Sequence, residues 1–142
     1  MPHVSEIMSP SPQVIGPEDT LQRAARMMKE LNVGALPVCN GKRVLGMVTD
    51  RDIAIRGVAA GMKPDAACVS DIMTVDVQCA TEDQDSDEVM RLMGDAQVRR
   101  VPVVNRRHEL VGILSLGDLA LRQSHDTDQT LREISLPTAH AA

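Results

Sequence analysis

The spacing of apolar residues early in the chain predicts an amphipathic helix. After the polar start GPEDT at 16–20, apolar residues recur every three or four positions, which is the period of one helix face. This stripe consists of Leu21, Ala24, Ala25, Met28 and Leu31. Gly34 is expected to end the helix, because glycine readily adopts the left-handed conformation found at helix ends.

Two short apolar runs after this helix predict a β-hairpin. The runs are ALPVC at 35–39 and RVLGMVT at 43–49, and the residues Asn-Gly-Lys between them are typical of a tight turn. A shorter strand is expected at 13–15, before the helix. A second helix is expected from Asp50, where the spacing of apolar residues becomes helical again.

The same succession of patterns returns in the second half of the chain, which indicates a duplication. VSEIM at 4–8 returns as VSDIM at 69–73, and Pro37 returns as Pro102, in both cases 65 positions later. Gly46 and Gly112 lie 66 positions apart, so the second copy has one extra residue, which fits best in the turn before the last strand. Several anchors in one order make the repeat specific.

Each copy therefore reads as strand, helix, strand, strand, helix. In the second copy we expect strands at 76–79, 101–104 and 110–114, and helices at 85–96 and from Leu116. A unit of about 60 residues is only marginally stable alone, so the two copies are expected to pack together. The segment 61–69 is expected to link them. The polar segment 124–142 is expected to be a tail with at most a short helix at 130–134.

Composition narrows the class of protein. The chain has 142 residues, 43% of them hydrophobic, and no Phe, Tyr or Trp, so its core must be aliphatic and methionine-rich. A net charge of −5, with basic residues clustered in nothing longer than adjacent pairs, disfavours nucleic-acid binding. No apolar run approaches the roughly 18 residues of a membrane span, and the N-terminus lacks a signal-peptide pattern. A cytoplasmic location without membrane association is therefore expected.

The cysteines do not suggest a disulfide scaffold. Cys39, Cys68 and Cys79 are odd in number and form no C-x-x-C pattern. Small buried or half-buried thiols are the simplest interpretation. The alternative is a redox-linked or intersubunit bond, with Cys39 expected near the surface because it stands at the end of a strand.

One motif occurs at the same place in both copies, where a strand enters a helix. GMVTDRD at 46–52 and GILSLGD at 112–118 each place a hydroxyl residue three positions before an aspartate. A capping box alone accounts for that spacing, because the hydroxyl and the acid can each accept a backbone N–H of the first turn. However, a helix start also favours anions and ribose hydroxyls, and the acid is Asp both times rather than the usual Glu or Gln.

These residues resemble a pair of CBS domains, the module named after cystathionine β-synthase. The resemblance covers residues 4–123, its motif G-h-x-[T/S]-x-x-D occurs twice, and the whole chain is similar to small stand-alone bacterial proteins made of two CBS domains. It implies an α/β (α+β) fold in which the two repeats pack with pseudo-twofold symmetry into one disc. The implied domains are CBS domain 1 at 4–62 and CBS domain 2 at 69–123, followed by the tail.

The resemblance also implies two clefts for adenosine-containing ligands such as AMP, ADP, ATP or S-adenosylmethionine. In such clefts the hydroxyl residue and the aspartate hold the ribose, a basic residue reaches the phosphate, and the other repeat contacts the base. One cleft would combine Ser115, Asp118, Arg99 and Arg100 with Val33, Ala35 and Gln13 of the other repeat. The second cleft would combine Thr49 and Asp52 with Val98 and Gln78.

The two implied clefts differ in their basic residues. The second has Gly34 and Ala35 where the first has Arg99 and Arg100, and only Arg51 could supply a charge for the phosphate. Because charge-assisted hydrogen bonds are about twice as strong as neutral ones, the Ser115/Asp118 cleft is expected to be the better nucleotide site. A solvated surface pair explains Arg99 and Arg100 equally well.

Other sites have little support. The acidic run 83–88 lacks the glycine and the final glutamate of a calcium loop, and acids at a helix start explain it. The histidines are scattered without ligand spacing, so no metal site is expected within one chain. No nucleophile has a matching base and orienting acid, so no catalytic residues and no enzyme activity are expected.

The leading hypothesis is a regulatory, ligand-sensing module. It would form a homodimer, bind an adenine nucleotide as ligand with no required cofactor, and signal to an unidentified protein in trans. The alternative is a stress-related structural or interaction protein that binds no nucleotide and is controlled by cysteine redox state or metal.

Overall fold

The computed structural model describes residues 2–126, with side chains described up to residue 121. These residues form a mixed α/β structure with two compact units. The first-repeat unit contains residues 12–77 and 108–110, and the second-repeat unit contains residues 2–11, 78–107 and 111–126. The short helix expected at 130–134 lies outside the described residues. No helix among the described residues is long and apolar enough to cross a membrane.

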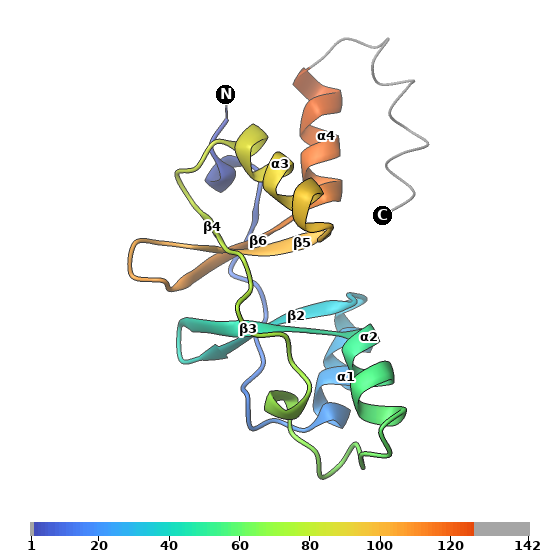
Figure 1. Cartoon of the computed structure of the whole chain (residues 1–142). Helices are drawn as coiled ribbons and strands as arrows, with labels where there is room; N and C mark the ends of the chain where they lie inside the picture. Colours follow the sequence, from blue (N-terminus) through green and yellow to red (C-terminus); the bar gives the residue numbers. More distant parts are fainter. Residues whose placement is uncertain (1, 127–142) are drawn as a thin grey trace. The chain divides into compact units, whose positions relative to one another are not determined.

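The first-repeat unit is built on the expected hairpin. Strand β2 (Ala35–Asn40) pairs antiparallel with β3 (Arg43–Thr49), and the turn between them contains Gly41 at a φ of 61°. A β-bulge interrupts the pairing between Val38 and Cys39. Helix α1 (Leu21–Leu31) and helix α2 (Asp50–Asp52) lie on the same face of this hairpin (Figure 1). Helix α2 continues directly into η2 (Ile53–Val58), a π-helix.

Helix α1 begins as expected but ends earlier than Gly34. The Thr20 hydroxyl accepts a hydrogen bond from the backbone N–H of Arg23 at 3.1 Å and caps the start. At the other end, Asn32 adopts the left-handed conformation with a φ of 55°, and its N–H returns to the helix carbonyls. Asn tolerates this conformation because its short polar side chain bonds locally, so the chain leaves the helix before Gly34 is reached.

The strand expected before the first helix of each repeat differs from the prediction. The first is shorter than expected, and the second is displaced. At 13–15 the structure has only an isolated parallel bridge between Ile15 and Val38. The strand expected at 76–79 forms instead at β4 (Ala80–Thr81), which pairs in parallel with β5. Asp76 has a φ of 55°, a left-handed conformation that prevents a continuous strand at this position.

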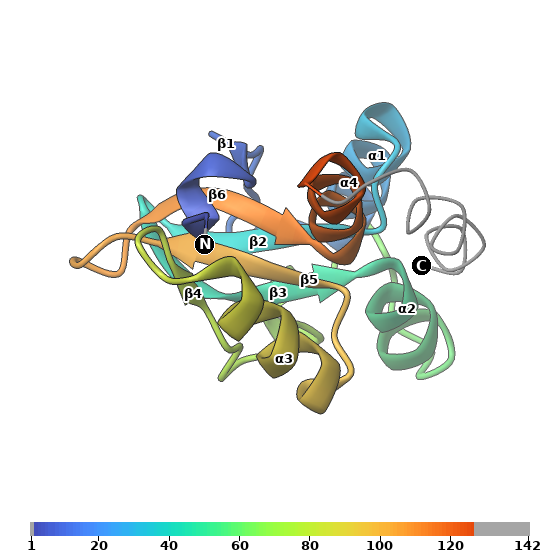
Figure 2. The same ribbon diagram turned by 90° about the horizontal axis from the view of Figure 1, so that it is seen from above.

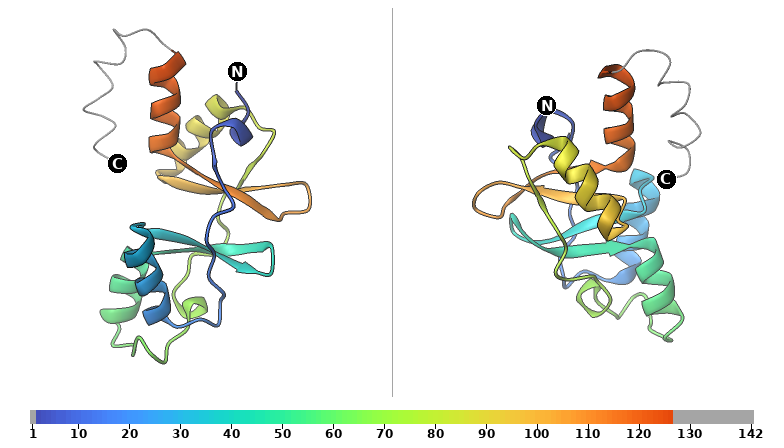
Figure 3. Two further views of the ribbon diagram at one scale, coloured as in Figure 1. Left: turned by 180° about the vertical axis from the view of Figure 1, so that it is seen from behind. Right: turned by 45° about the horizontal axis from the view of Figure 1, so that its top comes forward.

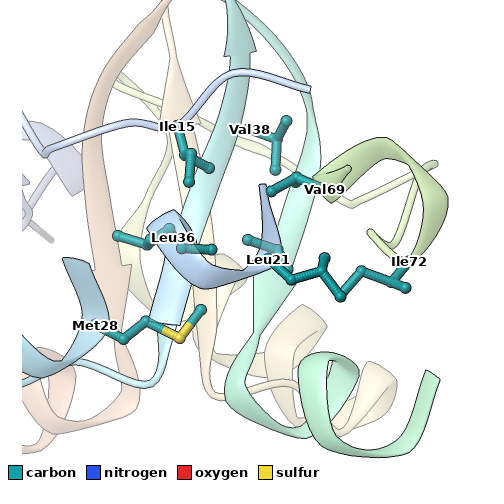
Figure 4. Close-up of a cluster of buried hydrophobic side chains, with 9 residues drawn as sticks. Ile15, Leu21, Met28, Leu36, Val38, Val69 and Ile72 are labelled. Atoms are coloured by element: carbon teal, nitrogen blue, oxygen red, sulfur yellow. The ribbon is translucent and has the colours of Figure 1, made fainter. Parts of the chain in front are cut away.

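The core of the first-repeat unit joins the helix stripe to the hairpin (Figure 4). Leu21 and Met28 of α1 meet Leu36 and Val38 of β2 in one cluster. Leu21, Ala24 and Met28 of the expected stripe are therefore confirmed as core, whereas Ala25 and Leu31 are exposed. The full cluster is Ile15, Leu21, Ala24, Met28, Leu36, Val38, Val48, Val69 and Ile72.

The second-repeat unit repeats this plan with a larger sheet. Strand β5 (Arg100–Val104) is flanked by β4 and β6 (Leu110–Ser115), and β1 (Ser9–Pro10) lies alongside β6 (Figure 2). Helices α3 (Ser86–Ala96) and α4 (Leu116–Asp126) cover one face of this sheet (Figure 3). Helix α4 thus continues into the segment expected as tail. The core cluster is Val4, Ala80, Val89, Met93, Val101, Val103, Leu114 and Leu119.

The segments that precede the two repeats are exchanged between the units. The first segment forms η1 (Val4–Glu6) and lies in the second-repeat unit, where Val4 N–H donates to the Gln84 carbonyl at 2.9 Å. The second segment forms η3 (Val69–Asp71) and lies in the first-repeat unit, where Val69 N–H donates to the Asp19 carbonyl at 2.8 Å. The recurring VSEIM and VSDIM sequences therefore each complete the core of the other repeat's unit.

Candidate functional site

The two recurring motifs form nearly identical caps. The Thr49 Oγ1 accepts from the backbone N–H of Asp52, and the Asp52 Oδ2 accepts from the backbone N–H of Thr49, both at 3.0 Å. In the second-repeat unit the Ser115 Oγ accepts from Asp118 N–H at 3.0 Å, and the Asp118 Oδ2 accepts from Ser115 N–H at 3.2 Å. Each pair is a capping box at the end of an apolar strand, so the structural interpretation of the spacing is confirmed.

Each cap leaves part of its carboxylate for other partners. Only Oδ2 of Asp52 and Oδ2 of Asp118 are used in the caps. The second oxygen of Asp52, Oδ1, lies 3.9 Å from the Nε of Arg56. The second oxygen of Asp118 has no hydrogen-bond or ion-pair partner among the described side chains. Both carboxylates are half-buried, so an oxygen that can accept further hydrogen bonds is held at each helix start.

The glycine of each motif has a structural role that the sequence did not reveal. A Cβ on Gly46 would collide with the carbonyl oxygen of Thr74, and a Cβ on Gly112 would collide with the Met8 side chain. Met8 and Thr74 belong to the exchanged segments, which cross the strands at these points. The sequence offered one signal for this role, because a glycine recurs at the same place in both copies of the motif, as Gly46 and Gly112.

The two caps have different charges beside them. In the second-repeat unit, Leu116 N–H donates to the Arg99 carbonyl at 2.9 Å. The exposed Arg99, just before β5, and Arg100, its first residue, therefore lie next to the Ser115 cap. In the first-repeat unit, the corresponding bond runs from Asp50 N–H to the Gly34 carbonyl, also at 2.9 Å. A Cβ on Gly34 would lie 3.0 Å from the Asp50 carboxylate, so an acid occupies this side of the Thr49 cap.

The structure thus gathers part of each expected site within one unit. Ser115, Asp118 and Arg99 lie together in the second-repeat unit. Thr49, Asp52 and Arg51 lie together in the first-repeat unit. Contacts from the residues expected to face the ligand from the other repeat stay predictions. Of these, Gln13 and Gln78 are exposed, and Val33, Ala35 and Val98 are half-buried.

Gln78 borders a hollow in the second-repeat unit with a volume of about 270 Å³. The hollow lies between β4, α3 and β5, and its walls include Ala80 and Leu92. The first repeat has Ile15 at the position equivalent to Ala80, and Ile15 is fully packed in its core. The shorter side chain therefore opens space beside Gln78 that the first-repeat unit fills.

The cysteines occupy unequal environments. Cys39 is buried in β2, whereas Cys68 and Cys79 are half-buried. Burial beside the hollow raises the pKa of the Cys79 thiol above its ordinary value of 9.0, because removal from water disfavours the thiolate. The burial of Cys39 disagrees with the expectation that it lies near the surface.

The described residues contain no group of three or more His, Cys, Asp or Glu side chains that could hold a metal ion.

The sequence features and the fold together point to one family. The sequence model of the CBS domain matches the chain twice, over residues 4–57 and 69–125. The chain belongs to the CBS domain family.

Two curated relatives match this CBS domain pair along nearly its whole length. It is 37% identical to Hypoxic response protein 1 of Mycobacterium tuberculosis over 139 residues, covering 96% of each chain. It is 36% identical to the CBS domain-containing protein YhcV of Bacillus subtilis over 142 residues, covering 99% of this chain and 100% of YhcV. The expectation of a small two-CBS protein is confirmed.

Solved structures agree with the fold. The crystal structure of Hypoxic Response Protein I with two coordinated zinc ions matches with a TM-score of 0.78 at 37% identity, covering 84% of this chain and 98% of that chain. The CBS domain pair of protein MJ0100, in complex with methylthioadenosine and S-adenosylmethionine, matches with a TM-score of 0.77 at 28% identity. That match covers 86% of this chain and 99% of that chain.

Proposed function

We propose that this CBS domain pair is a regulatory module that binds an adenosine-containing ligand and signals to another protein. The observation that carries the proposal is the double cap, because Asp52 and Asp118 each keep one carboxylate oxygen outside the cap at a helix start. The related pair of protein MJ0100, solved with methylthioadenosine and S-adenosylmethionine, supports the ligand class.

The chemistry of the caps suits a ribose. Its two adjacent hydroxyl groups can donate hydrogen bonds to the outer oxygen of one carboxylate, and bonds to a charged acceptor contribute about 1.5–3 kcal/mol each. The hydroxyls of Thr49 and Ser115 add a short polar contact on the same side. Since the chain has no aromatic residues, the adenine must be recognised by aliphatic side chains and backbone groups.

Phosphate binding is expected to favour the second-repeat motif. Arg99 and Arg100 provide two cations beside the Ser115 cap, whereas the Thr49 cap has Gly34 and Ala35 at the equivalent positions and the Asp50 carboxylate beside Gly34. A phosphate near Asp50 would meet repulsion that Arg51, or Arg56 beside Asp52, would have to offset. AMP and ATP are therefore expected to bind more tightly at Ser115 and Asp118 than at Thr49 and Asp52.

The test is titration calorimetry with AMP, ATP, S-adenosylmethionine and NAD. Heat is the required signal, because a chain without Trp or Tyr has no useful intrinsic fluorescence. Asp118→Asn keeps an acceptor for the cap and removes the charge, and it should weaken the AMP affinity by about tenfold or more. The matched Asp52→Asn should have the smaller effect. Equal losses would contradict the asymmetry, and no binding of any ligand would contradict the proposed function.

A second comparison isolates the phosphate contact. The double variant Arg99→Gln, Arg100→Gln should lose affinity for ATP by about tenfold while binding adenosine as well as the wild type does. A similar loss for adenosine would mean that the arginines support the fold of the site rather than the phosphate.

We also propose that the protein forms a homodimer. The described helices expose aliphatic side chains, including Ile55 and Val58 on η2 and Leu121 on α4. Ile55 and Leu121 are equivalent positions of the two repeats, 66 residues apart. Sedimentation at micromolar concentration tests the proposal, and a monomer there would contradict it.

The alternative function is a stress-related interaction protein that binds no nucleotide. It is favoured by the half-buried Cys68 and Cys79 and by the similarity to a protein named for the hypoxic response. This alternative requires that oxidation, or a metal such as zinc, change the association state of the protein. Sedimentation with and without oxidant or zinc, combined with the calorimetry above, separates the two functions.

A further inference from the structure

We infer that Arg56 is a positioning residue that ties the Asp52 carboxylate to the segment 69–77, which leads from the first repeat into the second. Through this link, a ligand at the Thr49/Asp52 motif would alter how firmly the segment is held. The ligand-dependent part of the inference rests on the proposed function, whereas the link itself does not.

Arg56 contacts both partners with one planar group. Its Nε lies 3.9 Å from the Asp52 Oδ1, and its Nη1 donates to the carbonyls of Ile72 at 3.3 Å and Met73 at 3.5 Å. A guanidinium carries five N–H donors in a fixed geometry, so it can bridge a carboxylate and backbone carbonyls at the same time. A lysine presents a single ammonium group and cannot reproduce this arrangement.

The local backbone keeps Arg56 in reach of both partners. Asp52 and Arg56 are four positions apart in a helix that becomes a π-helix from Ile53 onward. Gly57 is buried in the same turn, and a Cβ there would lie 2.8 Å from the Leu21 side chain. The π-helix therefore rests closely on α1, which places Arg56 beside the end of η3.

The contacts close into a ring that returns to the motif. After Met73, Thr74 forms two backbone hydrogen bonds with Met47, one of 2.8 Å and one of 3.0 Å. Met47 lies in β3, two residues before Thr49. The ring thus runs from β3 through the cap to Asp52, then to Arg56 and the segment, and back to β3. A change at Asp52 has a short physical path to the Thr74–Met47 bonds.

The ion pair between Asp52 and Arg56 is weak enough for a bound ligand to alter it. The Asp52 side chain is only 13% exposed, and Arg56 is its one ion-pair partner among the described residues. At 3.9 Å the pair is at the long end of an ion pair, so hydroxyl groups bound at Oδ1 would compete with the guanidinium. An arginine also recurs at the equivalent position of the second repeat, Arg122.

The test is hydrogen exchange of the Thr74 and Met47 amides in the full chain. Without ligand, Arg56→Gln and Asp52→Asn should each speed this exchange by about threefold, and the double variant should be no faster than either single variant. Arg56→Lys should recover only part of the protection. Arg26→Gln, which removes an exposed arginine of α1 in the same unit, should leave the exchange unchanged. Additive effects of the two changes, or no effect of Arg56→Gln, would overturn the link.

A second arm adds AMP at a concentration that saturates the Thr49/Asp52 motif, as measured by calorimetry on the Asp118→Asn variant, in which that motif is intact. AMP should change Thr74 exchange in the wild type and leave it unchanged in Arg56→Gln, although AMP still binds. Binding without a change in wild-type exchange, or an equal change in both proteins, would overturn the ligand-dependent part. If AMP fails to bind, the proposed function falls with that part, while the ligand-free comparison still decides whether Arg56 forms the link.

Discussion

At the residue scale, one oxygen of each motif carboxylate caps a helix, and the proposed ribose contact would use the other. Asp52 and Asp118 use Oδ2 to cap the helix start, which fixes the direction of the outer oxygen. An acceptor that is already fixed loses little conformational freedom when a ligand binds. Capping and binding are therefore compatible interpretations of the same residue, and the cap provides the rigidity that a ribose contact requires.

The glycines of the motif predict unequal costs of substitution. Gly46→Ala should lower the free energy of unfolding by about 1–3 kcal/mol, because the new Cβ meets the backbone carbonyl of Thr74. Gly112→Ala should cost less, since part of its clash is with the flexible side chain of Met8. Urea denaturation followed by far-UV circular dichroism measures both.

Gly94→Ala provides the control for these substitutions. Nothing lies within 4 Å of a Cβ at Gly94 in α3, so alanine should stabilise this helix by about 0.5–1 kcal/mol. If Gly46→Ala were as harmless as Gly94→Ala, the close approach of the segment at Thr74 would be wrong.

The Cys79 thiol predicts a pH dependence. Because burial raises its pKa above 9.0, the folded protein holds this proton to higher pH than the unfolded chain does. The associated stability is present below the ordinary pKa and is lost as the pH rises through the folded pKa. Alkylation of Cys79 by iodoacetamide, followed at the peptide level by mass spectrometry, should have its midpoint at a higher pH in the folded protein than in the unfolded chain. In concentrated urea the midpoint should fall, and equal midpoints would contradict the burial.

At the element scale, the sequence predicted the long elements well and the short ones poorly. Helix α1, the hairpin β2–β3 and strands β5 and β6 follow from strong apolar periodicity. The strands expected at 13–15 and 76–79 are too short for their position to be predicted from periodicity. The second forms at Ala80 instead, because Asp76 adopts a left-handed conformation that a strand cannot contain. The end of α1 was wrong because Asn32, rather than Gly34, adopts the left-handed conformation.

The helix ends give a prediction at this scale. Both α1 and α3 end on a left-handed residue, which is Asn32 in the first repeat and Gln97 in the second. This conformation costs an ordinary residue about 1–2 kcal/mol, whereas Asn tolerates it. Gln97→Gly should therefore stabilise the protein by roughly 0.5–1 kcal/mol, and Asn32→Gly should have a smaller effect. Thermal unfolding measures both, and a larger gain for Asn32→Gly would contradict the explanation.

At the scale of the whole molecule, the duplication was visible in the sequence, but the exchange of the leading segments was not. The repeat VSEIM and VSDIM indicates two equivalent segments without indicating which core each one enters. Only tertiary hydrogen bonds decide this, such as Val4 to Gln84 and Val69 to Asp19. The hydroxyl residue and the aspartate of each motif could be found from the sequence because they lie three positions apart. The role of Arg56 could not, because it contacts a carbonyl 16 residues away.

The exchange predicts that a substitution near the N-terminus weakens the second repeat. Val4 is fully buried in the core of the second-repeat unit, and Val69 is fully buried in the core of the first-repeat unit. Val4→Ala should remove roughly 1–3 kcal/mol of stability and raise the hydrogen exchange of β5 and β6, and Val69→Ala should do the same to β2 and β3. The two variants make the same chemical change at equivalent positions, so each is the control for the other. Faster exchange of β2 and β3 in Val4→Ala, with β5 and β6 unaffected, would mean that each segment serves its own repeat.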